Sequence, residues 1–244
     1  MKRWQLWLAL TLVALSAALY LLHYAIFRDA HHIAIYFLGD VAFIPIEVLL
    51  VTLIIHRLLQ VHEKRAMLHK MNMVIGAFYS EVGTGLMARL AEFDAGRDRL
   101  AKELAAARDW ADKDFLLAGR RFRDADFALD ALRGNLAGLR DFLVARRTFL
   151  LALLENPNLM EHETFTDVLW AVFHLTEELA ARRDLAACPA TDRDHLAGDL
   201  KRAYGRVLAE WLIYMWHLKR NYPYLFSLAL RTNPFDPAAR PEVA

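Results

Sequence analysis

The chain has 244 residues, of which 57% are hydrophobic, and its 30 basic and 29 acidic residues leave a formal net charge of +1. This balance argues against nucleic acid as the main partner, because phosphate binding needs a basic excess. The single cysteine, Cys188, rules out an internal disulfide and fits a reducing compartment. The apolar excess lies in residues 1–56, so the sequence predicts an integral membrane protein.

Two apolar runs predict a transmembrane hairpin in residues 1–56. Residues 4–27 contain no charged residue, Gly or Pro, and a second apolar run covers residues 33–55. At about 1.5 Å per residue, both runs are long enough as helices to cross the hydrocarbon core. The alternative is a signal peptide cleaved after Ala18, but the first run continues to Phe27, which is too long for a signal core.

Basic residues predict the orientation of the hairpin. They gather before the first run and after the second, at Lys2, Arg3, Arg57, Lys64, Arg65 and Lys70. The turn between the runs has only Arg28. Because basic loops stay on the cytoplasmic side, both termini are expected in the cytoplasm, with the protein in the inner (plasma) membrane.

The rest of the chain predicts helices only, so the fold class is all-α: a two-helix hairpin followed by a cytosolic helical bundle. We expect a juxtamembrane helix over residues 57–93, a helical domain over residues 94–232 and an irregular tail over residues 233–244. The juxtamembrane helix has an apolar stripe of Leu68, Met71, Ile75, Phe78 and Val82. The apolar stretch of residues 207–218 is too short to cross a bilayer and is expected in the core.

One apolar series predicts a single long helix with a heptad pattern. Its members alternate steps of four and three residues: Ala111, Phe115, Ala118, Phe122, Ala125, Leu129, Leu132, Leu136, Leu139, Leu143, Leu150 and Leu153. Arg146 interrupts the series. We favour a helix packed inside a bundle, and the pattern leaves a dimeric coiled coil open as the alternative. After a turn at residues 156–158, Thr164 is predicted to cap the next helix, with Asp167 in the capping-box position.

The C-terminal string HLKRNYPYLFSLALRTNPF, residues 217–235, resembles the signature of an uncharacterised prokaryotic family of two-span membrane proteins. The resemblance implies the two-span architecture, and no activity comes with it.

Asp40 and Glu47 are the candidate intramembrane site. They lie seven residues apart in the second run, so about 20° separates them on one helical face. A carboxylate near the centre of a bilayer costs about 2.5–3.5 kcal/mol on insertion scales. Pro45 lies between them and leaves the carbonyl of Val41 without its helical donor.

The first run offers a polar face of its own. Ser16, Tyr20 and His23 recur at steps of four and three, and in a hairpin Tyr20 is expected near the depth of Asp40. One interpretation is structural: both acids are neutral and hydrogen-bonded, or Glu47 joins two subunits. The other is that these oxygen atoms handle a cation or a proton.

Other polar residues give weaker signals. The turn residues Asp29, His31 and His32 form too open a set for a metal, and His174 with Glu178 fits a surface pair on one helix. The sequence has no phosphate loop, dinucleotide-binding turn or nucleophile elbow, so we expect no cofactor, no metal and no enzyme.

The sequence therefore favours a non-enzymatic, membrane-anchored helical scaffold or sensor module. The alternative is a subunit of an oligomeric cation or proton channel that uses Asp40 and Glu47. The expected partners are the lipid bilayer and either further copies of the chain or a membrane partner protein.

Overall fold

The computed structural model describes residues 3–157, 159, 162–236 and 239–242, and Lys2 lies outside them. Across this part of the chain the structure is helical, without strands beyond an isolated bridge between Asp94 and Leu129. The all-α prediction is confirmed. The chain divides into two compact units, Met1–Arg65 and Ala66–Ala244.

The first unit is a helical hairpin. It consists of α1 (Arg3–Phe27) and the first part of α2 (Ala30–Phe78). Arg28 turns the chain in the left-handed region, with φ of 51°, and its backbone N–H donates to Tyr24 at 2.8 Å. The Asp29 side chain then accepts the backbone N–H of His32 at 3.0 Å, which satisfies one of the free donors at the start of α2.

Both helices of the hairpin are apolar and expose nearly all of their side chains. Arg3–Phe27 and Ala30–Val61 are long and apolar enough to cross a membrane. No residue in the most apolar 18-residue stretch of either helix is buried within the structure. The predicted runs, residues 4–27 and 33–55, fall inside these two helices.

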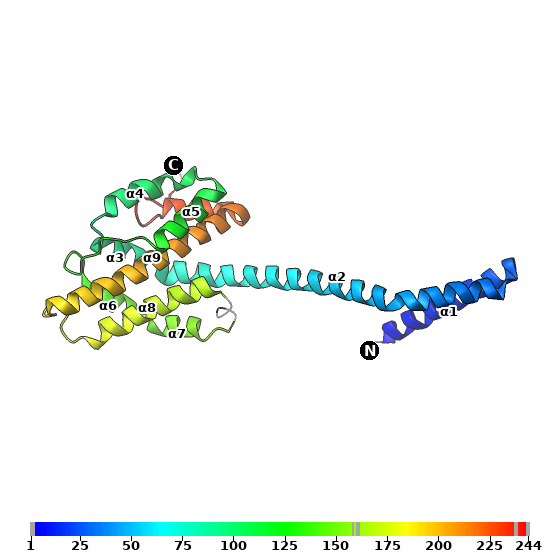
Figure 1. The fold of residues 1–244 in the computed structure, drawn as a ribbon. Coiled ribbons are helices and arrows are strands. Elements are labelled where there is room, and N and C mark those ends of the chain that lie inside the picture. Colours follow the sequence, from blue (N-terminus) through cyan, green and yellow to red (C-terminus); the bar gives the residue numbers. More distant parts are fainter. Residues whose placement is uncertain (1–2, 158, 160–161, 237–238, 243–244) are drawn as a thin grey trace. The chain divides into compact units, whose positions relative to one another are not determined.

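The second unit starts with the end of α2 and is a bundle of mostly short helices (Figure 1). In chain order its elements are the π-helical turn η1 (Tyr79–Gly83), α3 (Thr84–Leu90), η2 (Ala91–Phe93), α4 (Arg97–Ala105), η3 (Ala106–Arg108), α5 (Asp112–Arg123), α6 (Leu136–Val144), α7 (Arg147–Leu154), α8 (Glu163–Ala181), α9 (Ala190–Asn221) and α10 (Pro223–Arg231).

Helix α9 is the centre of this bundle and packs against α3, α5, α8 and α10. Its middle is buried almost all the way round, as expected for a helix that is apolar on every face. The predicted core stretch 207–218 is confirmed, because its buried members are Val207, Leu208, Ala209, Glu210, Trp211, Leu212, Met215 and Leu218.

Two glycines bring α5 and α9 close together. A Cβ at Gly119 on α5 would lie 3.3 Å from the carbonyl oxygen of Ala209. A Cβ at Gly205 on α9 would lie 3.1 Å from the carbonyl oxygen of Phe122. Because these neighbours are backbone atoms, a larger residue would push the helices apart.

The predicted single long helix from Ala111 to Leu153 is wrong. The structure replaces it with α5, an irregular segment at residues 124–135, and then α6 and α7. The irregular segment bonds to distant backbone instead: Ala95 N–H donates to Ala128 and Asp130 N–H donates to Phe93. Asp130 also accepts the backbone N–H of Leu132, a local bond that competes with the helix.

The residues of the heptad series are buried where they lie in α5, α6 or α7. Phe115, Ala118, Phe122, Leu136, Leu139, Leu143, Leu150 and Leu153 are buried. Ala111 is exposed and Leu132 is 70% exposed, although both keep the heptad phase. Arg146 marks the break between α6 and α7, where its guanidinium donates to the backbone carbonyl of Glu81 in η1 at 2.8 Å.

The predicted cap of α8 is also wrong. The capping residue is His162, whose Nδ1 accepts the backbone N–H of Phe165 at 3.1 Å. Thr164 lies inside the helix, and its hydroxyl is 3.1 Å from the same Nδ1. An imidazole nitrogen thus fills the acceptor position that Ser, Thr, Asp or Asn usually provides.

The juxtamembrane stripe belongs to the core of the second unit. Met71, Ile75, Phe78 and Val82 are buried there, while the side chain of Leu68 lies outside the described residues. The compact units divide at Arg65 and Ala66, nine residues after the end of the hairpin expected from sequence.

Two leucines of the heptad series allow a matched test of this core. Leu139 is 1% exposed and Leu132 is 70% exposed. We expect Leu139→Asp in the full-length protein to lose its cooperative thermal transition, because a buried unpaired carboxylate costs about 4 kcal/mol or more. Leu132→Asp should melt within about 0.5 kcal/mol of wild type. Near-ultraviolet circular dichroism in detergent measures both, and loss of the transition in Leu132→Asp as well would show that the long-helix interpretation was right.

Candidate functional site

The hairpin brings part of the predicted intramembrane set around one pocket of about 440 Å³. Its lining residues come from both helices: Ser16, Leu19, Tyr20, His23, His32, Ile33, Tyr36 and Asp40. The polar face of α1 therefore meets Asp40. Val41, Pro45 and Glu47 do not line this pocket, and Glu47 is exposed further along α2.

Imidazole rings fill the end of the pocket nearest the turn. The rings of His23 and His32 stack with their centroids 5.8 Å apart and an interplanar angle of 7°, and Tyr36 lies 4.6 Å from His32. The Nε2 atom of His23 is buried and makes no hydrogen bond to any described residue. The pocket therefore gathers polar atoms of both helices between two largely apolar runs.

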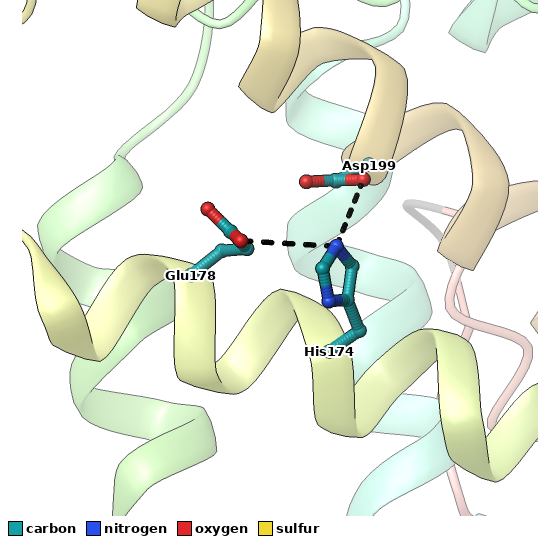
Figure 2. A group of neighbouring side chains, drawn as sticks. All are labelled: His174, Glu178 and Asp199. Atoms are coloured by element: carbon teal, nitrogen blue, oxygen red, sulfur yellow. Dashed lines mark ion pairs between the residues drawn. The ribbon is translucent and has the colours of Figure 1, made fainter.

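A second polar cluster lies between α8 and α9, and the sequence analysis identified only half of it (Figure 2). His174 and Glu178 come from α8, as one i, i+4 pair, and Asp199 comes from α9. One ligand atom from each of these three residues lies within 4.8 Å of the other two. His195 on α9 completes a ring of ion pairs with the same two carboxylates.

The ring alternates imidazole and carboxylate. Nε2 of His174 is 3.5 Å from Oδ1 of Asp199 and 3.9 Å from Oε1 of Glu178. Nε2 of His195 is 3.4 Å from Oδ2 of Asp199 and 3.6 Å from Oε2 of Glu178. Each histidine thus contacts one carboxylate on its own helix and one on the neighbouring helix.

Two arginines hold the carboxylates in place. Arg182 donates to Glu178 at 2.7 Å and forms a bidentate pair with Asp192 at 2.6 and 2.8 Å. The hydrogen bond from Arg182 is the main cause that lowers the pKa of Glu178, and it does the same for Asp192. Arg202 donates to Oδ1 of Asp199 at 2.8 Å.

A repeated motif in the sequence was the missed signal. Residues 174–179 read HLTEEL and residues 195–200 read HLAGDL, so His, Leu, an acid and Leu recur at the same positions. The four leucines, Leu175, Leu179, Leu196 and Leu200, are fully buried between helices. Because antiparallel neighbours are related by a local two-fold axis, the same motif on both helices brings each histidine to the other helix's acid.

Glu210 is a third polar feature, buried in the core of the second unit. It is 1% exposed, and its Oε2 makes no hydrogen bond to any described residue, with the nearest Arg123 guanidinium nitrogen at 3.7 Å. Burial raises the pKa of Glu210, and the nearby His162, Thr164 and Arg123 oppose that rise. The pKa of Tyr79 is also raised, mainly by burial and then by the charge of Glu210. Its hydroxyl donates to the backbone carbonyl of Val207 at 2.8 Å.

The fold defines a class of proteins in which two apolar N-terminal helices precede an all-helical domain. Family models match both parts: "MJ1433, N-terminal helical domain" covers residues 1–59, and "Uncharacterized protein MJ1433, C-terminal helical domain" covers residues 67–231. The chain is 44% identical over 235 residues to the Uncharacterized protein MJ1433 of Methanocaldococcus jannaschii, across 96% of this chain and 94% of that protein.

The chain therefore belongs to the MJ1433 family. The resemblance noted in residues 217–235 is confirmed, since the matched C-terminal domain covers most of that string. No solved structure matches the chain.

The buried acid Glu210 predicts a pH dependence of stability. Its folded pKa lies above the ordinary value of 4.5, so the folded state holds the proton more tightly than the unfolded state. Its contribution is therefore most favourable below 4.5 and is lost as the pH rises through the folded pKa. We expect Glu210→Gln to raise the melting temperature near neutral pH and to flatten its decline as the pH rises from 4.5 towards neutral.

Exposed Glu155 provides the control, because Glu155→Gln removes the same charge at the surface. Melting curves of both variants across this pH range, compared with wild type, isolate the contribution of Glu210. A Glu210→Gln protein that is less stable than wild type at neutral pH would show that the charged carboxylate is needed by the fold.

Proposed function

We propose that the protein is a membrane-anchored helical module, in which the hairpin crosses the bilayer twice and the C-terminal domain acts as a scaffold or sensor at the cytoplasmic face. One observation carries the anchor: α1 and the first part of α2 are apolar along their length, yet they bury none of that surface within the structure. Exposed apolar surface on this scale needs a cover, and lipid fits two helices of spanning length.

The orientation rests on the distribution of basic residues. Arg3 is the first residue of α1 and Arg57 follows the second apolar run, whereas the two-residue turn between the helices has Arg28 as its one basic residue. The positive-inside rule then places both termini in the cytoplasm. The relative from Methanocaldococcus jannaschii matches over 94% of its own length, which supports a hairpin and a domain that work together.

A second candidate function is cation or proton conduction through an oligomer. The observation in its favour is the pocket of about 440 Å³ that places Ser16, Tyr20, His23 and Asp40 together. A two-helix hairpin has one mutual interface and cannot enclose a pore, so conduction requires several copies or a membrane partner. We favour the anchor as the main function, because Asp40 is the one acid that lines this pocket and the polar face of α1 can hydrogen-bond it without further helices.

Reporter fusions test the orientation. We expect an alkaline phosphatase fused after Ala244 to be inactive in a bacterial host and a fluorescent protein at the same place to be bright, because the C-terminus faces the cytoplasm. A phosphatase inserted between Arg28 and Asp29 is the matched control and should be active. The reverse pattern would overturn the topology, and a mature N-terminus at Leu19 would establish a cleaved signal peptide.

Charge-removing substitutions separate anchoring from conduction. Asp40→Asn and Glu47→Gln keep the shape and hydrogen-bonding capacity of the side chains. For an anchor we expect both variants to insert and assemble as wild type does, and no flux through either wild type or variant in liposomes. Wild-type cation or proton flux that Asp40→Asn abolishes, with assembly unchanged, would establish conduction instead.

A further inference from the structure

We propose that His174, Glu178 and Asp199, whose ligand atoms lie within 4.8 Å of one another, bind one divalent transition-metal ion with His195 as the fourth ligand, and that zinc fits best. The site lies wholly within the second unit, on α8 and α9, so it stands independently of the membrane anchor. Figure 2 shows three of the four side chains, with His174 turned towards both carboxylates.

The spacing of the ligand atoms fits a metal. Metal–nitrogen and metal–oxygen bonds are about 2.0–2.2 Å, so neighbouring ligands of a tetrahedral ion lie roughly 3.3–3.6 Å apart. Three of the imidazole–carboxylate distances, 3.4, 3.5 and 3.6 Å, fall in this range, and the distance from His174 to Glu178 is 3.9 Å. Each carboxylate presents one oxygen to His174 and the other to His195, so either oxygen can serve as the ligand atom. These distances are longer than ordinary charge-assisted hydrogen bonds of about 2.7–2.9 Å, so the side chains converge without bonding directly.

Asp199 supplies a second, independent observation. Its side chain is only 2% exposed, and its Oδ2 makes no hydrogen bond to any residue that the structure describes. This atom faces Nε2 of His195 at 3.4 Å. A buried carboxylate oxygen without a hydrogen bond is costly, and a metal ion at this position would satisfy it.

The surrounding arginines orient the carboxylates as outer-shell groups do in metal sites. Arg182 and Arg202 each donate to one ligand carboxylate, and Arg182 is itself held by Asp192. The carboxylates of Glu178, Asp192 and Asp199 outnumber the guanidinium groups of Arg182 and Arg202 by one. With neutral histidines this leaves one negative charge, which favours a cation.

The donor set selects the kind of ion. Two imidazoles and two carboxylates suit zinc and other borderline divalent ions, whereas magnesium and calcium prefer oxygen donors alone. The histidine side chains are 46% and 55% exposed, so a bound ion would lie near the surface and exchange with the solvent. The alternative is a ring of ion pairs with protonated histidines, which needs no metal.

Zinc binding to the full-length, tag-free protein in detergent tests the proposal. After chelation and removal of the chelator, isothermal titration calorimetry with zinc should show one tight equivalent. Saturation at about 100 times the dissociation constant should raise the melting temperature by roughly 5–10 °C. His174→Ala and His195→Ala change exposed residues, so both should fold and bind zinc at least about 10-fold more weakly.

The matched controls lie on the same helices. Glu177→Gln on α8 and Asp194→Asn on α9 each remove an exposed acid next to a ligand, and both should bind zinc as wild type does. A millimolar excess of magnesium or calcium should not displace the zinc. No tight equivalent in wild type, equal binding by the histidine variants, or displacement by magnesium or calcium would each overturn the proposal.

Discussion

The burial of α9 is the constraint on which the second unit depends. The middle of α9, residues 207–218, is apolar on nearly every side and can be stable only when other helices surround it, and α5, α8 and α10 supply that cover. The close approach of α5 requires glycine at Gly119 and Gly205, where a side chain would meet backbone carbonyl oxygens. α8 packs on α9, and each helix contributes buried leucines to the core: Leu175 and Leu179 from α8, and Leu196 and Leu200 from α9.

Sequence periodicity predicted those features that are set by the apolar pattern within one segment of the chain. The two apolar runs, the core stretch of α9 and the absence of strands from the described residues all follow from local hydrophobic spacing. The long helix failed because the same spacing can continue through a segment that leaves the helix. Leu129 and Leu132 keep the heptad phase, yet backbone bonds to residues 93–95 and the Asp130 side chain hold this segment in an irregular path.

The candidate sites show the same limit. The polar face of α1 could be matched to Asp40 because a short turn between two helices fixes which residues of a hairpin lie together. His174 and Asp199 are far apart in the chain, and only the packing of α8 on α9 brings their ligand atoms to 3.5 Å. A comparison of residues 174–179 with residues 195–200 would have revealed the repeated motif, but not that the two copies face each other.

Both features of the repeated motif follow from the geometry of antiparallel helices. In each copy both leucines are buried, while the histidine beside the first leucine and the acid beside the second lie at the edge of the α8–α9 contact. A register shift of one helical turn between α8 and α9 would separate the leucines and the polar ring at the same time. The hydrophobic contact therefore fixes the positions of the four polar side chains before any ion binds. A ligand set held in this way loses little conformational entropy on binding, which is the condition for a tight metal site on a surface.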